Sequence, residues 1–538
     1  MKLAARAASV ALIAAGAAFA QDQTLIIDQD RADRSAPGAD AQGLRGRFGE
    51  APPAPPAPPA PTERVMIRAV TIEGGTLSQA DLNAAVAPLR DRPLDRTLMS
   101  DIARAIASVY ARSDVALHAV RARPTIGADG VLRIVVIEQR VDAVTFRGDS
   151  NGDIDILRAY AAPLTREDPL SRRTLERAAL LMRDVPGVEI ELRSAETSDP
   201  AVAALDARVT RKRFEYALGA DTRGATQLGR TRLQATMTAN GVSRLGDETR
   251  VTLGASPDAA RYAYAAASHR QLVGGDGLSL RGTFSVLQTS PQDGVRGDAQ
   301  SAGLQAAYPF IRANRRTLTG SASFDALNSD RAVLGAVVAA ERTRVLRGSF
   351  AYVDAPVGGS MRFGATLSAG VAGLGAGASH PDRIDLDFVK LSAQWGATRD
   401  FGVAWRLNTQ IGAQASGAMT PASERFALGG TAFGRGFPAA AASGDSGIGA
   451  SAELAYQHDQ NETLRGAYAF LDGGVARLNA RPGQASRRQT LASAGGGVRL
   501  AIGEDATVTL EAAKALDEPD PDSEVRGWRL NLGLDAKF

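Results

Sequence analysis

From about Glu215 to Phe538, the chain is a succession of short segments in which apolar and polar residues alternate. In the last segment every second residue from Trp528 to Phe538 is apolar, and the positions between them include Arg529 and Asp535. Such alternation predicts β-strands with one apolar face and one polar face. Repeated over three-fifths of the chain, such strands form either soluble sandwiches or a closed barrel whose outer face contacts lipid.

Before this region, the spacing of apolar residues changes from strand-like to helix-like and back, twice in the same order. The first copy predicts a strand over 66–72, helices that begin at Ser78 and Asp95, and strands over 119–125 and 131–138. Both helix-starting residues are of the types that cap N-termini. The second copy predicts a strand over 143–147, helices over 154–162 and 171–183, and strands over 188–193 and 203–210. Two copies of one small β-α-α-β-β unit therefore precede the alternating region.

The composition narrows the kinds of protein that fit this pattern. At 538 residues the chain is long for one soluble domain, unless a large barrel accounts for most of it. The absence of cysteine excludes disulfides, thiolate metal sites and cysteine nucleophiles. The four histidines, His118, His269, His380 and His458, are far apart in the sequence, so no metal site is predicted. Because 62 basic residues nearly balance 59 acidic ones, no nucleic acid partner is predicted either.

The N-terminus has the features of a secretory signal peptide. Lys2 and Arg6 precede an apolar run over 7–19, and residues 18–20 form a small-x-small cleavage site. We therefore predict a signal peptide over residues 1–20. Residues 21–64 are predicted as an N-terminal extension and linker, in which the run over 51–61 holds seven prolines in eleven positions. Such a run favours an extended polyproline II spacer.

A secreted, cysteine-free, glycine-rich β protein of this kind is typical of the bacterial outer membrane. Its β-α-α-β-β units followed by a barrel resemble the polypeptide-transport-associated (POTRA) domains of outer membrane transporters. Two such units after a Pro-rich linker resemble the two-partner secretion transporters (TpsB type), also called hemolysin secretion/activation proteins. Four segments are similar to this family's barrel signatures and occur in the family's order: 222–241, 308–312, 367–375 and 421–447.

The resemblance implies a mainly β fold, in which a transmembrane antiparallel β-barrel of about 16 strands follows two small α/β POTRA domains. At roughly 20 residues per strand and connection, 16 strands fit the alternating region. We expect the first POTRA domain over 65–141, the second over 142–214 and the barrel over 215–538. Asp114 and Val115 stand where the family often has a Gly-aromatic pair. Residues 21–50 match the family poorly, so a pore-plugging helix is left open there.

The resemblance also implies a contact between a loop and the inner wall of the barrel. Arg435, Gly436 and Phe437 correspond to the family's loop motif, which has a branched aliphatic residue where this chain has Gly434. In the family the loop folds back into the barrel, and its Arg pairs with the Asp of an F-x-D-x-G motif. The corresponding residues in this chain are Phe470, Asp472 and Gly474.

The two-residue alternation of a strand also predicts which of these side chains point into the barrel. Tyr468, Phe470 and Asp472 share one strand face, so we expect them to face the lumen while Ala469 and Leu471 face lipid. A guanidinium and a carboxylate can form a bidentate, charge-assisted pair, which would hold the loop tip inside the pore. The alternative is that Arg435 and Asp472 are ordinary solvated charges.

Two short motifs offer enzyme chemistry, and neither is favoured. Residues 444–447 read GDSG, which surrounds the nucleophile of chymotrypsin-like proteases, but none of the four histidines lies in that family's setting. A turn before the next strand is the favoured interpretation of Ser446. A P-loop requires Gly-Lys followed by Ser or Thr, and none of the lysines has these neighbours. We therefore predict no catalytic residue, no cofactor and no enzymatic activity.

We expect an outer membrane transporter that captures an unfolded exoprotein of the hemolysin or adhesin type in the periplasm and exports it through its barrel. The aromatic Phe538 resembles the signal that barrel assembly machinery recognises. The expected partners are the exported protein, outer membrane lipids and that machinery, and the chain is expected to be monomeric. An insertase of the same superfamily, a passive porin and, as the enzyme alternative, a secreted serine protease stay open.

Overall fold

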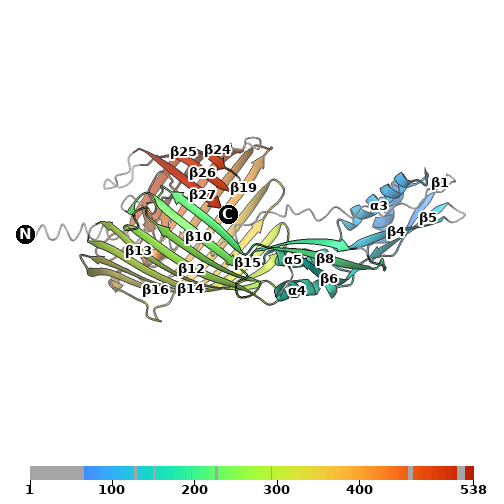
Figure 1. Cartoon of the computed structure of the whole chain (residues 1–538). Helices are drawn as coiled ribbons and strands as arrows, with labels where there is room; N and C mark the ends of the chain where they lie inside the picture. The colour runs from blue at the N-terminus through green and yellow to red at the C-terminus, as the bar shows by residue number, and fades with distance from the viewer. Residues whose placement is uncertain are drawn as a thin grey trace, which may run out of the picture.

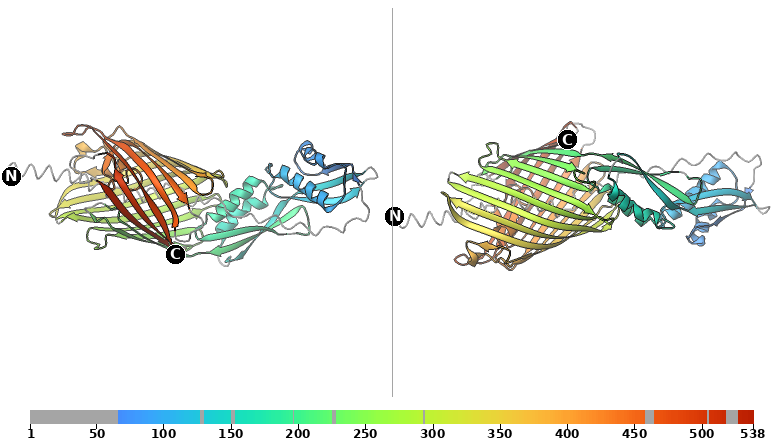
Figure 2. Two further views of the ribbon diagram at one scale, coloured as in Figure 1. Left: turned by 90° about the horizontal axis from the view of Figure 1, so that it is seen from above. Right: turned by 60° about the horizontal axis from the view of Figure 1, so that its bottom comes forward.

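The computed structural model describes residues 66–126, 130–149, 153–195, 197–224, 228–292, 294–457, 464–503, 505–517 and 527–538. The predicted signal peptide over 1–20 and the predicted extension and linker over 21–64 lie outside the described residues. Two small α/β units follow one another along the chain and lead into a large barrel (Figure 1). The further views show the two units in line at one end of the barrel (Figure 2).

The first unit has the predicted order of strands and helices. Its elements are β1 (Met66–Ile67), β2 (Ala69–Glu73), α2 (Gln79–Val86), β3 (Arg92–Pro93), α3 (Arg96–Tyr110), β4 (His118–Ile126) and β5 (Val131–Glu138). The main sheet has the order β2-β5-β4, in which β2 is parallel and β4 antiparallel to β5. The strand predicted over 66–72 is thus two strands, because β1 pairs with β3 instead of joining the main sheet.

The helices of the first unit cover one face of this sheet. Asp95 caps α3 by accepting a hydrogen bond of 2.7 Å from the backbone N–H of Leu98. Ile102 and Ile106 of α3 are fully buried and belong to the same core as Ile134 of β5. The side-chain cap predicted for Ser78 is wrong: its backbone carbonyl, and not its hydroxyl, receives the first N–H groups of α2.

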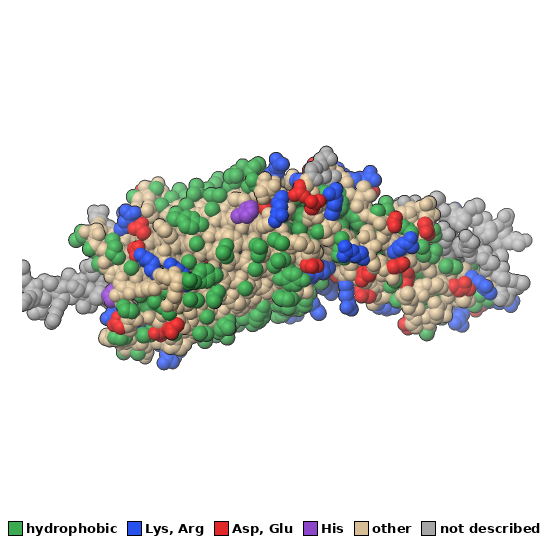
Figure 3. All heavy atoms as spheres, turned by 90° about the horizontal axis from the view of Figure 1, so that it is seen from below, with side chains coloured by type: hydrophobic (Ala, Val, Ile, Leu, Met, Phe, Trp, Pro, Cys, Tyr) green, Lys and Arg blue, Asp and Glu red, His purple; other side chains and the backbone are tan. Residues whose placement is uncertain are grey.

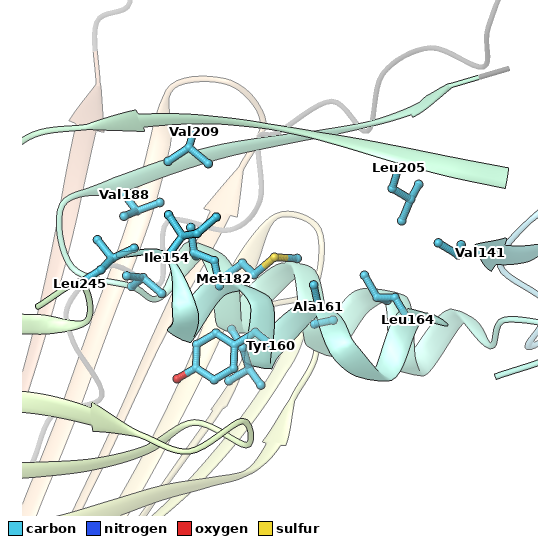
Figure 4. Close-up of a cluster of buried hydrophobic side chains, with 14 of the residues drawn as sticks. Val141, Ile154, Tyr160, Ala161, Leu164, Met182, Val188, Leu205, Val209 and Leu245 are labelled. Atoms are coloured by element: carbon cyan, nitrogen blue, oxygen red, sulfur yellow. The ribbon is translucent and has the colours of Figure 1, made fainter. Parts of the chain in front are cut away.

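The second unit repeats the order. Its elements are β6 (Arg140–Gly148), α4 (Asp155–Ala161), η2 (Ala162–Thr165), α5 (Arg172–Arg183), β7 (Val188–Ala195) and β8 (Val202–Arg211). The sheet has the order β6-β8-β7. Ile154 and Met182 lie between the helices and Val209 of this sheet, whereas Tyr160 lies on the opposite side of the helices (Figure 4). The sequence places Ser171 before α5, where its hydroxyl accepts the N–H of Thr174 at 3.2 Å.

The turn after α3 joins the two units. Asp114 and Val115, which replace the family's Gly-aromatic pair, both contact the second unit at the start of α5. The backbone N–H of Arg172 donates to the carbonyl oxygen of Asp114, and Val115 forms an isolated β-bridge with Ser171. The Asp114 carboxylate also lies 3.4 Å from Arg173. These two residues therefore connect the first unit to the second, and the turn that they form is not exposed on all sides to solvent.

The barrel closes through sixteen antiparallel strands, which confirms the predicted fold class. Around the barrel they are β9 (Phe214–Asp221), β10 (Arg232–Asn240), β11 (Asp247–Ala255), β12 (Tyr262–Val273), β13 (Leu278–Gln292), β14 (Val295–Arg312), β15 (Arg316–Val333), β16 (Ala336–Asp354), β17 (Gly359–Gly370), β19 (Val389–Phe401), β20 (Trp405–Ala415), β23 (Ser446–Gln457), β24 (Leu464–Leu478), β25 (Arg487–Ile502), β26 (Ala506–Ala515) and β27 (Trp528–Lys537). A short β18 (Gly377–Ala378) adds to β16.

The last and first strands form the seam. β27 pairs with β9 from Gly533 opposite Asp221 to Lys537 opposite Ala217. Beyond this ladder, the backbone N–H of Phe538 donates to the carbonyl oxygen of Tyr216 at 2.9 Å. Phe538, which the sequence predicts as an assembly signal, thus lies at the barrel seam, and its side chain is 57% exposed.

The outside of the barrel is apolar. Hydrophobic side chains gather over the barrel surface, and charged side chains gather toward its ends and on the N-terminal units (Figure 3). Leu304, Leu530 and Leu471 are 70%, 70% and 59% exposed, whereas polar side chains such as Asp325 and Asn531 are buried inside. In the part of the chain that the structure describes, no helix has the length and apolar character needed to cross a membrane.

The second unit is fastened to turns at the near end of the barrel. Leu245 and Leu272 come from the barrel but belong to the apolar core of the second unit, where Figure 4 shows Leu245 beside Val188. At the end of β14, the guanidinium of Arg312 donates to both carboxylate oxygens of Asp184, at 2.7 and 2.6 Å. The barrel and the second unit therefore share a core and a bidentate ion pair.

Candidate functional site: a loop held inside the barrel

The longest connection between barrel strands, residues 416–445, turns back into the lumen. It contains the short helical turn η5 (Ala422–Glu424) and a hairpin of β21 (Phe426–Leu428) and β22 (Ala442–Gly444). Its buried residues contact the face of β24 that carries Phe470 and Asp472, which are 5% and 4% exposed. Because Leu471 and Ala469, on the other face, are exposed to the outside, the loop lies within the barrel.

Arg435 lies near the tip of this loop and is surrounded by carboxylates. Its Nη1 is 2.8 Å from Oε2 of Glu453 and 3.4 Å from Oε2 of Glu511. Its Nε is 3.4 Å from Oδ2 of Asp472. The guanidinium carbon also lies 4.2 Å from the centre of the Phe470 ring, in cation–π geometry. The Arg435 side chain is 13% exposed, so these contacts are well shielded from water.

The Asp472 carboxylate holds the loop mainly by accepting hydrogen bonds from backbone N–H groups of the loop. Its Oδ1 accepts the N–H of Gly434 at 3.0 Å and the N–H of Arg435 at 3.3 Å, and also the hydroxyl of Ser493. The bidentate side-chain pair expected between Arg435 and Asp472 is therefore absent from this geometry. The reason is that the guanidinium of Arg435 donates instead to Glu453, on an inward position of β23. The oxygens of Asp472 accept hydrogen bonds from backbone N–H groups of the loop and from the Ser493 hydroxyl.

Three glycines of the two motifs give the loop tip its shape and space. Gly434 has φ of +95°, a left-handed conformation that a branched aliphatic residue adopts only with strain. A Cβ on Gly436 would lie 2.8 Å from the backbone nitrogen of Ala515. A Cβ on Gly474 would lie 2.4 Å from the carbonyl oxygen of Ile448. Gly434 thus permits the left-handed turn at the loop tip, and the other two glycines permit close backbone approach.

Apolar side chains of the loop fit against small residues of the wall. Phe437, which is 1% exposed, packs in one cluster with Leu428 and Phe433 of the loop. The wall contributes Ala476 and Leu491 to this cluster. Glycines at three neighbouring inward positions leave room for the aromatic rings, since a Cβ there would clash with Phe433 or Phe426: Gly412, Gly447 and Gly449.

The base of the loop has a second ion pair, which includes the residue before Ser446. Asp445 is fully buried and accepts from both Nη atoms of Arg481, at 3.0 and 2.9 Å. The same carboxylate accepts the N–H and the hydroxyl of Thr420, at 2.8 and 2.7 Å. Ser446 is the first residue of β23, and its hydroxyl donates to the carbonyl oxygen of Ser416 at 3.0 Å. The GDSG segment is thus the turn that leads from the loop into a strand.

The structure brings together five of the predicted site residues: Arg435, Gly436, Phe437, Phe470 and Asp472. Gly474 lies two residues after Asp472, on the same face of β24. Sequence reasoning missed Glu453, Glu511 and Ser493, which complete the contact. The alternation within β23, β25 and β26 places all three on inward positions, so a search for inward carboxylates would have found two of them. Within the described ranges, no group of three or more His, Cys, Asp or Glu side chains is arranged to hold a metal ion.

The fold and the site together define an outer membrane β-barrel protein with POTRA-type N-terminal domains and a loop held in its lumen. Residues 205–500 match the haemolysin secretion/activation protein family (ShlB/FhaC/HecB). Since this match covers more than half of the chain, the protein belongs to that family. The comparison with curated protein sequences gave no match.

Solved structures share this architecture. CdiB from Escherichia coli superposes with a TM-score of 0.69 at 19% identity, over 97% of this chain and 98% of that one. CdiB from Acinetobacter baumannii gives a TM-score of 0.63 at 13% identity, over 97% and 98%. BamA from Haemophilus ducreyi lacking POTRA domains 1–3 gives 0.54 at 14% identity, over 88% and 100%. At these identities the likeness shows the fold.

The family assignment settles the class and the location of the protein. It is an outer membrane transporter of the two-partner secretion type. Its barrel lies in the outer membrane, and its POTRA domains lie in the periplasm, as in the rest of the family. The family consists of secretion proteins and is not an enzyme family.

Proposed function

We propose that this protein captures an unfolded partner exoprotein in the periplasm and exports it through its barrel. Family membership supports a secreted protein as the partner. The POTRA domains lie at the periplasmic end, where a cargo arrives, and the second domain is fixed to the barrel through Leu245, Leu272 and the Arg312–Asp184 pair. Capture and conduction are thus assigned to different parts of one connected molecule.

The observation that carries this proposal is that the lumen already contains an extended polypeptide. The β21–β22 hairpin lies inside the barrel, and the backbone N–H groups of Gly434 and Gly436 donate to Asp472 and Ser493 of the wall. A wall that holds one hairpin through side-chain hydrogen bonds offers the same groups to another. Release of the loop around Arg435 would leave the inner wall free for a passing segment of the exoprotein.

Capture is assigned to an exposed sheet edge. In the second POTRA domain β8 is the central strand and β7 is an edge strand of the β6-β8-β7 sheet. An unfolded segment can add to such an edge as a further strand through main-chain hydrogen bonds. Because the chain has no nucleotide-binding motif, the driving force is assigned to folding of the exoprotein outside the cell, which prevents its return.

Disulfide crosslinking tests edge addition directly, because the chain has no cysteine of its own. Glu191 on β7 and Arg208 on β8 are exposed cross-strand partners in the same sheet. A strand added at β7 lies about 4.8 Å from Glu191 and twice that from Arg208, and a disulfide needs Cβ atoms about 4 Å apart. We expect Glu191→Cys to trap a cysteine-bearing exoprotein and Arg208→Cys not to. Equal trapping at both positions would contradict edge addition.

Removal of residues 66–138, which ends before β6 of the second domain, separates the proposal from its two alternatives. Export predicts that the exoprotein disappears from the medium, while the barrel still inserts and other outer membrane proteins keep their levels. A general loss of outer membrane barrels would favour an insertase. Unchanged conductance together with unchanged secretion would favour a passive porin, in which the N-terminal domains have no part.

A further inference from the structure

A second polar anchor holds the lumenal loop on a different stretch of the barrel wall from Arg435. Glu424, at the end of η5, is 1% exposed. Its two carboxylate oxygens accept from Nη2 and Nη1 of Arg347 at 2.7 and 3.1 Å. Its Oε2 is also 2.9 Å from Nζ of Lys390. A buried carboxylate with one bidentate and one further cationic partner is a strong contact.

The cations of this anchor are themselves held in place. Nε of Arg347 donates to Asp325 at 3.0 Å, and its Nη1 donates to Ser368 at 2.8 Å. Nζ of Lys390 donates to the backbone carbonyl oxygen of Glu424 at 2.8 Å. These contacts join two carboxylates to two cations. Removal of the Glu424 carboxylate would take a negative charge away from two buried cations.

The two anchors lie on different walls. Asp325, Arg347 and Lys390 belong to β15, β16 and β19, whereas the partners of Arg435 belong to β23, β24 and β26. In the sixteen-strand order, the two strands that contact Glu424 directly, β16 and β19, lie four and two strands before β23, which carries Glu453. Glu424 and Arg435 are only 11 positions apart in the chain. The loop is therefore fixed to two separate stretches of the barrel wall.

We propose that Glu424 is a second latch of the lumenal loop, which must also open before the pore conducts a polypeptide. If Arg435 alone detaches, the η5 segment stays bound to β16 and β19 and remains inside the lumen. If both detach, the loop loses both of its charged anchors to the wall and keeps its apolar packing around Phe437 and the Asp445–Arg481 pair at its base. Glu424 is thus a positioning residue for the proposed export, and the inference rests on that function.

A single introduced cysteine reports this latch without any exoprotein. Ser423, beside Glu424, is 6% exposed, and its hydroxyl has no hydrogen-bond partner among the described residues, so Ser423→Cys removes no hydrogen bond. The rate at which a membrane-impermeant maleimide labels this cysteine in the purified, folded full chain measures how often η5 leaves the wall. The variants compared in this background are Arg435→Ala, Glu424→Gln, their combination, and Asp382→Asn as an exposed-carboxylate control.

We expect Glu424→Gln to raise the labelling rate about tenfold or more, which corresponds to a loss of at least about 1.4 kcal/mol. Arg435→Ala and Asp382→Asn should leave the rate within about twofold of the parent. In planar bilayers, the combination of Arg435→Ala and Glu424→Gln should pass more current than the two single changes added together. Labelling in Arg435→Ala as fast as in Glu424→Gln would show one latch and not two. A combined conductance equal to that of Arg435→Ala alone would also overturn the proposal.

Folding is checked in each variant by the change of electrophoretic mobility on heating. If Glu424→Gln does not fold, Glu424→Asp replaces it, because the shorter side chain cannot reach both Arg347 and Lys390. This variant should be labelled faster than the parent, and a parental rate would count against the latch. Since neither labelling nor conductance needs the exoprotein, an intact second latch in a protein that fails to export would reject the proposed function and leave the latch standing.

Discussion

The POTRA domains and the barrel have opposite interiors. Among the residues that the structure describes, every buried polar or charged side chain lies between Thr238 and Asn531, in the barrel and its lumenal loop. The POTRA domains bury apolar and tyrosine side chains such as Ile106, Leu157 and Tyr160. The difference follows from the surroundings: a domain in water must hide its apolar groups inside, whereas a barrel in lipid shows them outside.

Because of this difference, the residues that stabilise the POTRA fold and the residues that let the lumenal loop move lie in different parts of the molecule. An apolar core is packed continuously, so a change in it affects the whole domain. The barrel wall is stabilised by its own strand ladders, so its lumen is free to contain ion pairs and a loop whose contacts break and form without unfolding the wall. The same kind of substitution should therefore unfold one region and only release a loop in the other.

The largest expected effect is in the POTRA core. Leu157 of α4 is fully buried, and Leu157→Ala should lower the free energy of unfolding of the second POTRA domain by about 2–5 kcal/mol through lost burial and the cavity left behind. Urea unfolding followed by limited proteolysis measures this. Leu304→Ala, on the lipid-facing side of β14, is the control and should leave both regions folded. Loss of the heat-modifiable barrel in Leu157→Ala would contradict the separation of the two regions.

In the lumen, loss of the Arg435 side chain or of the Asp472 carboxylate should release the loop tip and leave the barrel folded. Truncation of one partner of a desolvated charge pair costs about 2–5 kcal/mol, and water in the lumen lowers this. We expect Arg435→Ala and Asp472→Ala to insert normally, secrete poorly and change pore conductance to a similar degree, with the double variant no worse than either. Additive defects would show that the two residues act independently.

A smaller effect is expected at the loop turn itself. Gly434→Val introduces the family's branched residue at φ of +95°, which costs about 1–3 kcal/mol of backbone strain. This should loosen the loop tip and raise conductance less than Arg435→Ala does. Gly335→Val is the matched control, because Gly335 has φ of +83° in a turn with nothing within 4 Å of an added Cβ. Equal conductance changes in the two variants would show that strain alone, and not the loop, is responsible.

The fold was predictable because the sequence has two clear patterns of apolar residues, one with the two-residue period of a strand and one with the spacing of a helix. The alternation of Trp528, Leu530 and Leu532 defines a two-faced strand, and the spacing of Leu98, Ile102 and Ile106 defines a helix stripe. These patterns depend only on neighbours in the chain. Helix bounds such as those of α5 could therefore be stated to within one residue.

The site was less predictable, because its contacts join strands that are far apart in the sequence. Arg435 meets Glu453 and Glu511, and no local pattern shows that these two side chains converge on one guanidinium. The family motif named Asp472 but not its preference for backbone N–H groups. The Glu424 anchor depends on Arg347, 77 positions earlier in the chain, so only the closed barrel reveals it.

The smallest expected effect is a pH dependence at the start of α5 in the POTRA region. Burial alone would raise the pKa of Glu167, but hydrogen bonds from the backbone and hydroxyl of Ser171 and from Thr174 outweigh it, so the pKa is lowered from its ordinary value of 4.5. A carboxylate with a lowered pKa in the folded state adds stability above its unfolded pKa, and this stability is lost as the pH falls through the folded value.

Glu167→Gln should therefore reduce the thermal stability of the second POTRA domain at pH 7, and the difference from the unchanged protein should shrink as the pH falls below about 4.5. Melting curves followed by circular dichroism between pH 7 and pH 3 measure this. Glu189→Gln, at an exposed carboxylate on β7, is the control and should show no such convergence. A difference between Glu167→Gln and the unchanged protein that stays constant down to pH 3 would mean that the charge of Glu167 contributes nothing, and that its effect on the cap of α5 is one of shape alone.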